Sequence, residues 1–187
     1  MRTYKQRLLL GCVLLCALFG SAATAYAPFK VTTVFLVRHA EKQSNATDAE
    51  LSDIGHARAK RLAVVLAKAE IKAIYTSQFQ RTKQTGAPLA QALGLTMTEI
   101  KVESVQNPAG QMAGSSLSPA TLKNYGDAIA QNAGQTALIV GHSNTVPALI
   151  AKLGVAQPVT IPDNENDNLY VVTIYAKGKA TLAQIKY

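Results

Sequence analysis

The chain has 187 residues, of which 48% are hydrophobic, and a formal net charge of +8 at pH 7. This length suits one α/β domain with a well-buried core and excludes two such domains behind a leader. The lysines and arginines are scattered rather than clustered, so the positive charge favours encounter with anionic substrates and does not indicate a nucleic-acid surface.

Residues 1–25 have the order of a secretory signal peptide, with a basic head, an apolar segment at residues 8–19 and a tail of small residues. The apolar segment is shorter than the roughly 20 residues that a membrane span needs, which disfavours an uncleaved anchor. We expect cleavage after Ala25, with Ala27 as an alternative and a lipid anchor at Cys12 disfavoured. The mature domain would cover residues 26–187 and be exported to a periplasm or to the medium.

Both cysteines, Cys12 and Cys16, lie in this leader. The mature chain therefore has no thiol, which excludes a cysteine nucleophile, a thiolate metal site and a disulfide framework. The three histidines, His39, His56 and His142, lack the spacing of metal ligands, so we predict neither a metal nor a cofactor. We interpret His56 as a surface residue of a helix.

From residue 31 onward, strand and helix patterns alternate. Apolar or β-branched runs predict strands, and apolar residues at helical spacing predict helices. The predicted strands are 31–37, 74–77, 96–102 and 136–140, and the predicted helices are 54–70, 79–93, 118–132 and 146–153. Two further strands, 168–176 and 179–187, would form an edge hairpin across Lys177-Gly178. The pattern predicts a three-layer α/β/α sandwich with a mostly parallel central sheet.

Capping residues and apolar spacing define two of these helices further. Ser52 or Asp53 would cap the helix over 54–70, and Ser118 with Pro119 would open the helix over 118–132. The apolar residues that recur along the first of these helices are Ile54, Ala57, Leu62, Val65, Leu66 and Ala69.

Two of the predicted strands end in a histidine. Residues 31–37 run into Arg38 and His39, and residues 136–140 run into Gly141 and His142. Ligands of open α/β sheets bind beyond the carboxyl ends of the strands, so we expect both histidines at one edge of the sheet. An Arg-His pair after one strand is equally typical of a solvated turn, and it is the second histidine that indicates a site.

Four blocks of sequence occur in a fixed order: Val37-Arg38-His39-Ala40-Glu41, then Leu51-Ser52-Asp53-Ile54-Gly55-His56-Ala57-Arg58-Ala59, then Tyr75-Thr76-Ser77 with Arg81-Thr82 and Gln84-Thr85, then Val140-Gly141-His142-Ser143-Asn144-Thr145. In this combination the chain resembles the histidine phosphatase superfamily, the phosphoglycerate mutase-like group, over nearly all of its length from residue 31. The resemblance implies a metal-independent phosphohydrolase that cleaves phosphomonoesters through a phosphohistidine intermediate.

By this resemblance, His39 is the residue that is transiently phosphorylated, while Arg38 and Arg81 clamp the phosphoryl oxygens. Neutral imidazole is a competent nucleophile, and the phosphohistidine is labile enough for water to attack it. His142 would donate to the same phosphoryl group, most usefully as the imidazolium. Glu41, or equally a backbone carbonyl, would fix the tautomer of His39.

The proton donor to the leaving group is an open assignment. Family members usually carry it on a glutamate or aspartate in a loop beyond the second arginine, and Glu103 lies at about that place. Because the pattern around Glu103 does not single it out, Glu41 is a competitor. Asp163 and Glu165 are more distant candidates on a polar loop.

The leading interpretation is an exported phosphatase that acts on a small phosphorylated substrate, with neither a nucleic acid nor a membrane as partner after signal cleavage. The alternatives are a phosphate-binding or signalling module with little turnover, a phosphohistidine-protein phosphatase, and a mutase. The short stretch between Arg81 and His142 disfavours the mutase. Substrate selectivity would lie in the loops at 43–50, 104–117 and 157–166, and the sequence leaves the substrate and the oligomeric state open.

Overall fold

The computed structural model describes residues 30–106 and 112–187. The predicted signal peptide at residues 1–25 lies outside these ranges and stays a prediction. Within the described ranges, no helix combines the length and the apolar character that crossing a membrane requires.

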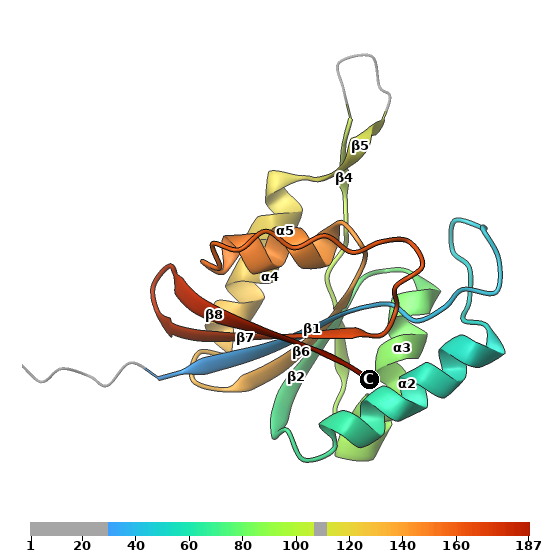
Figure 1. Cartoon of the computed structure of the whole chain (residues 1–187), viewed down its shortest axis with the longest axis horizontal. Helices are drawn as coiled ribbons and strands as arrows, with labels where there is room; N and C mark the ends of the chain where they lie inside the picture. Colours follow the sequence, from blue (N-terminus) through green and yellow to red (C-terminus); the bar gives the residue numbers. More distant parts are fainter. Residues whose placement is uncertain (1–29, 107–111) are drawn as a thin grey trace, which may run out of the picture.

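A six-stranded sheet forms the middle layer of the domain (Figure 1). In spatial order its strands are β3 (Met97–Glu99), β2 (Ile71–Thr76), β6 (Thr136–Gly141), β1 (Thr32–Arg38), β7 (Asn168–Ala176) and β8 (Lys179–Lys186). The first four are parallel to one another, whereas β7 and β8 are antiparallel to their neighbours. The predicted hairpin between β7 and β8 turns at Gly178, whose φ is +67°. The mostly parallel sheet with an antiparallel edge is confirmed.

Helices cover both faces of this sheet (Figure 1). One face packs against α2 (Asp53–Leu66) and α3 (Gln80–Leu93), and the other packs against α4 (Pro119–Gln131) and α5 (Thr145–Lys152). Alternate residues of β6 enter the two cores, with Leu138 and Val140 on the α2 and α3 side and Ala137 and Ile139 on the other. A strand buried on both faces needs no polar alternation, which explains the continuous apolar run of its sequence. The three-layer sandwich is confirmed.

Several predicted boundaries differ from the structure. The helix expected to reach residue 70 ends at Leu66, and the strand expected over 96–102 is only Met97–Glu99. Residues 104–117, predicted to be a loop, contain the strands β4 (Ser104–Gln106) and β5 (Met112–Leu117), which pair antiparallel with each other. Their sequence carries no alternating apolar pattern, so nothing local predicted this hairpin.

The buried face of α2 also differs from the prediction. Ile54 and Val65 are 67% and 44% exposed. The buried residues of this helix are Gly55, Ala59, Leu62, Ala63 and Leu66. The reason is a close backbone approach, because a Cβ on Gly55 would lie 2.2 Å from the carbonyl oxygen of Glu41. Ser52 is the cap, and its side chain accepts a hydrogen bond from the Gly55 amide at 3.2 Å.

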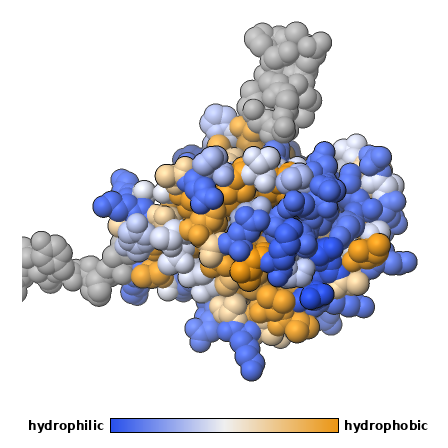
Figure 2. Space-filling view, in the orientation of Figure 1, coloured by the Kyte–Doolittle hydropathy of each residue, from blue (hydrophilic) through white to orange (hydrophobic). Residues whose placement is uncertain are grey.

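The first turn of α2 therefore lies directly against the residues that follow β1, and it turns some apolar side chains outward. Figure 2 shows hydrophobic side chains reaching the surface in several places among the hydrophilic ones. Val64 of α2, which is 77% exposed, is one of the large hydrophobic residues on the surface.

Candidate active site

The two strand-end histidines meet at one edge of the sheet. Strands β1 and β6 are neighbours, with Arg38 paired to Gly141, and the His39 amide donates to the Gly141 carbonyl oxygen at 2.9 Å. The rings of His39 and His142 are 5.4 Å apart between centroids, in an edge-on arrangement. Both residues are buried, with 5% and 8% exposure. The expectation that the parallel strands bring these side chains together is confirmed.

The tautomer of His39 is fixed by a backbone carbonyl. Nδ1 lies 2.8 Å from the carbonyl oxygen of Ala40, which can only accept, so Nδ1 carries the proton and Nε2 keeps a lone pair. Burial lowers the pKa of His39 to about 4, against the opposing effect of the Ala40 bond and with help from nearby cations including Arg81 and Arg38. At neutral pH His39 is thus a neutral imidazole, the form that can attack phosphorus.

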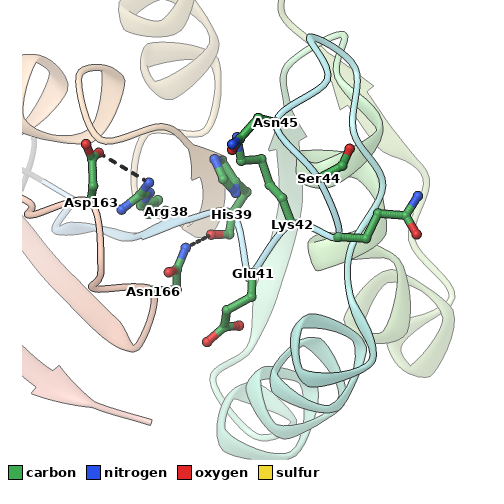
Figure 3. A pocket seen from close by; sticks show the side chains of 9 residues that line it. Arg38, His39, Glu41, Lys42, Ser44, Asn45, Asp163 and Asn166 are labelled. Carbon is green, nitrogen blue, oxygen red and sulfur yellow. Dashed lines mark hydrogen bonds and ion pairs between the residues drawn. The ribbon is translucent and has the colours of Figure 1, made fainter.

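The Glu41 side chain pairs with α2 rather than with His39. Its carboxylate accepts from Arg58 of α2, at 2.6 Å from Nη2 and at 2.8 and 2.9 Å from Nε. Burial alone would raise the pKa of Glu41, but the bonds from Arg58 outweigh it and hold that pKa below its usual value. Figure 3 shows the Glu41 side chain directed away from the imidazole of His39. The structure does not bring this carboxylate to the nucleophile.

His142 is held by a buried serine. Its Nε2 lies 2.9 Å from the hydroxyl oxygen of Ser77, and that hydroxyl lies 2.9 Å from the hydroxyl of Thr82. Ser77 and Thr82 are fully buried. The sequence placed Ser77 in a motif without giving it a role, because its partner lies just beyond another strand, 65 positions away.

The charge of His142 differs from the expected imidazolium. Burial, together with the neighbouring His39, Arg81 and Arg38, lowers its pKa to about 3. His142 is therefore neutral at pH 7 in this structure. A phosphoryl dianion placed between the arginines would offset their charge and favour the imidazolium.

Arg38 and Arg81 are each held by backbone carbonyls at one guanidinium nitrogen. Nη1 of Arg38 donates to Pro162 at 2.8 Å and to Glu165 at 3.3 Å, and Nη1 of Arg81 donates to Thr47 at 2.8 Å. Both Nε atoms are buried and have no hydrogen-bond partner among the described residues. Burial lowers the pKa of both arginines, and the charge of Arg38 lowers that of Arg81 further. Two close cations with free donors are an arrangement that suits a phosphoryl group.

A cavity of about 380 Å³ opens beside His39 (Figure 3). All nine lining residues are polar or charged: Arg38, His39, Glu41, Lys42, Gln43, Ser44, Asn45, Asp163 and Asn166. Two of the three loops predicted to govern selectivity, 43–50 and 157–166, supply lining residues. The cavity offers many hydrogen-bonding groups and no large apolar surface.

The loop at 162–166 is fastened to the histidine motif by residues that the sequence did not indicate. The Asn166 amide nitrogen donates to the carbonyl oxygen of His39 at 2.8 Å, across 127 positions of sequence. The Tyr187 hydroxyl donates to the Asn166 carbonyl at 3.3 Å, and the Tyr187 ring is buried. Asparagine in a polar loop carries no local signal of such a contact.

The four candidate proton donors are placed very differently. Glu103 is exposed, is not among the residues lining the cavity, and within the described part of the chain its carboxylate makes no hydrogen bond or ion pair, so its role stays a prediction. Glu41 is paired with Arg58. The Glu165 carboxylate accepts from Asn168 and lies 3.5 Å from Lys186. Asp163 lines the cavity.

His56 is exposed on α2, as expected. In residues 30–106 and 112–187, no cluster of three or more histidine, cysteine, aspartate or glutamate side chains is arranged to hold a metal ion.

Comparison with known proteins gives one family match. The model of the histidine phosphatase superfamily (branch 1) matches residues 34–104, which include Arg38, His39, Arg81 and Glu103, whereas His142 lies beyond the matched segment. A comparison with curated proteins finds no match.

Three solved phosphatase structures share the fold of this chain. The protein histidine phosphatase SixA, complexed with tungstate, is 22% identical, with a TM-score of 0.61 over 82% of this chain and 96% of its own. A mycobacterial glucosyl-3-phosphoglycerate phosphatase is 15% identical, with a TM-score of 0.61 over 84% and 98%. Phosphoserine phosphatase from Entamoeba histolytica, in complex with 3-phosphoglyceric acid, is 18% identical, with a TM-score of 0.62 over 83% and 97%.

Proposed function

We propose that this chain is a member of the histidine phosphatase superfamily, whose model matches residues 34–104, and that it hydrolyses phosphomonoesters through a phosphohistidine formed at Nε2 of His39. One observation carries the proposal. His39 is a neutral imidazole whose Nδ1 is bound to the Ala40 carbonyl. Arg38 and Arg81 lie near it, and their buried Nε atoms have no hydrogen-bond partner among the described residues.

The proposed reaction uses these groups in two steps. The Nε2 lone pair of His39 attacks phosphorus and the bond to the leaving-group oxygen breaks, so that the alcohol departs, while the Arg38 and Arg81 guanidinium groups stabilise the charge on the phosphoryl oxygens. His142, held by Ser77, takes a proton from solvent as the dianion binds, donates a hydrogen bond to the same oxygens, and gives the proton back when phosphate leaves. Water then attacks the phosphohistidine, releasing inorganic phosphate and regenerating the neutral imidazole.

The lining of the cavity supports a small hydrophilic substrate. A leaving group that enters beside His39 meets Lys42, Gln43, Ser44 and Asn45, which offer a positive charge and hydrogen bonds. An apolar leaving group would find little apolar surface to pack against at this lining. We therefore propose hydroxylated or carboxylated phosphomonoesters rather than aryl or lipid ones as the natural substrates.

Export is part of the proposal and rests on the composition of residues 1–25. Its test is N-terminal sequencing of the protein recovered from the cells in which it is naturally made. A mature start at Tyr26 is expected, and an intact Met1 on the mature protein would contradict export by this route.

The test of the proposed function is phosphate release from a panel of phosphomonoesters in the presence of a chelator. Wild type should turn over, and His39→Ala should fall to the uncatalysed background because the nucleophile is removed. His56→Ala, which alters an exposed histidine of α2, is the matched control and should keep full activity. Equal background rates for wild type and His39→Ala would contradict the phosphatase assignment and favour a phosphate-binding module.

A further inference from the structure

We propose that Asp163 is the group that protonates the leaving-group oxygen, an inference that rests on the proposed function. Asp163 and Arg38 lie on the same side of the His39 imidazole in the cavity (Figure 3). Its Oδ1 lies 3.6 Å from Nη2 of Arg38, and its side chain is 97% exposed. A carboxyl group therefore stands at the mouth of the cavity that would receive the leaving group.

The loop that carries Asp163 is fixed at the site on both sides of this residue. Nη1 of Arg38 donates to the carbonyl of Pro162, just before Asp163, and to that of Glu165, two residues after it. Asn166 then bonds to the His39 carbonyl. The backbone is thus tied to the two residues of the motif that handle phosphate, while the Asp163 side chain stays free to turn toward a bound substrate.

Three other carboxylates, one from the cavity lining and two from the loops that supply lining residues, are engaged elsewhere. Glu41 also lines the cavity, but its two oxygens accept three close contacts from Arg58. Glu165 is bonded to Asn168 beside Lys186. Asp48 accepts from the amide of Gln80 at the start of α3. Asp163 is the carboxylate of the cavity lining whose described contacts consist of one long, exposed ion pair, which a substrate can replace.

Substrate binding itself prepares this carboxyl for the step. A phosphoryl oxygen that takes Nη2 of Arg38 displaces Asp163 from its ion pair, which leaves the carboxyl group free to contact the leaving-group oxygen. As Nε2 of His39 bonds to phosphorus, the bond from phosphorus to the leaving oxygen breaks. Its electron pair goes to that oxygen, which takes the proton of Asp163 and departs as an alcohol.

The second step returns the proton. The Asp163 carboxylate removes a proton from the attacking water as the water oxygen bonds to phosphorus. The bond from phosphorus to Nε2 breaks, its electron pair returns to the imidazole, and phosphate leaves. His39 and the protonated Asp163 are then restored for the next cycle.

The test compares leaving groups. A general acid matters for an alkyl ester, whose alkoxide is a poor leaving group, and little for a nitrophenyl ester. For Asp163→Asn we expect kcat/KM with glycerol phosphate to fall about 100-fold, within the range typical of general acid catalysis, and with nitrophenyl phosphate to fall less than about threefold. Asp127→Asn, which removes an exposed carboxylate paired with Lys123 on α4, is the matched control and should change neither value.

The Glu103→Gln variant tests the alternative proton donor. A selective loss for glycerol phosphate in Glu103→Gln, with none in Asp163→Asn, would overturn the proposal and assign the proton transfer to Glu103. An equal loss for both esters in Asp163→Asn would also overturn it, because that result indicates phosphate binding rather than protonation. If wild type and His39→Ala are equally inactive on both esters, the proposed function itself fails, a result distinct from these two.

Discussion

Nδ1 of His39 and the carbonyl oxygen of Ala40 lie 2.8 Å apart, a contact between neighbouring residues that decides which ring nitrogen can react. Because the carbonyl can only accept, the lone pair of the imidazole belongs to Nε2. The arginines that flank the ring lower its proton affinity further, so the nucleophile needs no separate base to be ready at neutral pH.

Ser77→Ala should lower kcat roughly tenfold or more, because it removes the hydroxyl that contacts His142 at 2.9 Å and leaves a buried polar atom without its partner. The measurement is steady-state kinetics together with the NMR signals of the His142 ring, which should shift. Ser118→Ala is the matched control, since it removes the hydroxyl that caps α4. It should cost about 1 kcal/mol of stability and leave kcat unchanged. An unchanged His142 signal in Ser77→Ala would contradict the role given to Ser77.

Glu41→Gln should destabilise the fold by about 1–3 kcal/mol, because Arg58 loses a charged partner that it contacts at 2.6 Å in a half-buried position. Denaturant unfolding measures this loss. Its effect on kcat/KM should be the same for alkyl and aryl esters, since the carboxylate faces α2 rather than the substrate. A variant with normal stability and a selective loss for alkyl esters would instead assign the proton transfer to Glu41.

Thr85→Val should also reduce stability by about 1–3 kcal/mol. The fully buried Thr85 hydroxyl accepts from the Ala40 amide at 2.9 Å and donates to the Arg81 carbonyl at 2.7 Å, so it joins the first histidine motif to α3. The measurement is the unfolding midpoint, with KM for substrate as a second readout that should rise as Arg81 loses its position. Thr85→Ser, which keeps the hydroxyl, should recover KM, and a failure of this recovery would show that packing, not the hydrogen bonds, matters.

Stability should fall as the pH drops from 7 to 5. Burial lowers the pKa of His39 to about 4 and of His142 to about 3, below the unfolded value near 6.5. Between those values the unfolded chain binds more protons than the folded one, so stability rises with pH and is lost on acidification. Each histidine should contribute up to about 2 kcal/mol of this loss.

The check is denaturant unfolding at both pH values. His142→Asn should weaken the pH dependence, whereas His56→Asn, at an exposed position, should leave it as in wild type. An identical pH dependence in wild type and His142→Asn would contradict the burial of a neutral imidazole at this position.

The fold and the two histidines were predictable because their signals are local. An apolar run that ends in His39 and a second that ends in His142 indicate parallel strands whose ends share an edge. The two arginines came with the resemblance to the family. In contrast, Ser77, Asn166 and Arg58 act through partners far away in sequence, and no periodicity or spacing reveals a hydrogen bond between a loop and a strand end 127 positions apart.

The prediction of the buried face of α2 was wrong for a related reason. Apolar spacing favoured Ile54 and Val65, but the helix rotates so that Gly55 meets the backbone at Glu41. A close backbone contact of this kind outweighs the burial of a few methyl groups. A hydrophobic pattern cannot predict such a contact.

The most direct test of the proposed mechanism is the chemical identity of the phosphorylated residue. Wild-type protein mixed rapidly with substrate and quenched in alkali should carry phosphate on His39, and NMR of the isolated peptide should place the phosphorus on Nε2. His39→Ala should carry none. Phosphorus on Nδ1, on His142, or on no residue while phosphate is still released would contradict a phosphohistidine formed at Nε2 of His39.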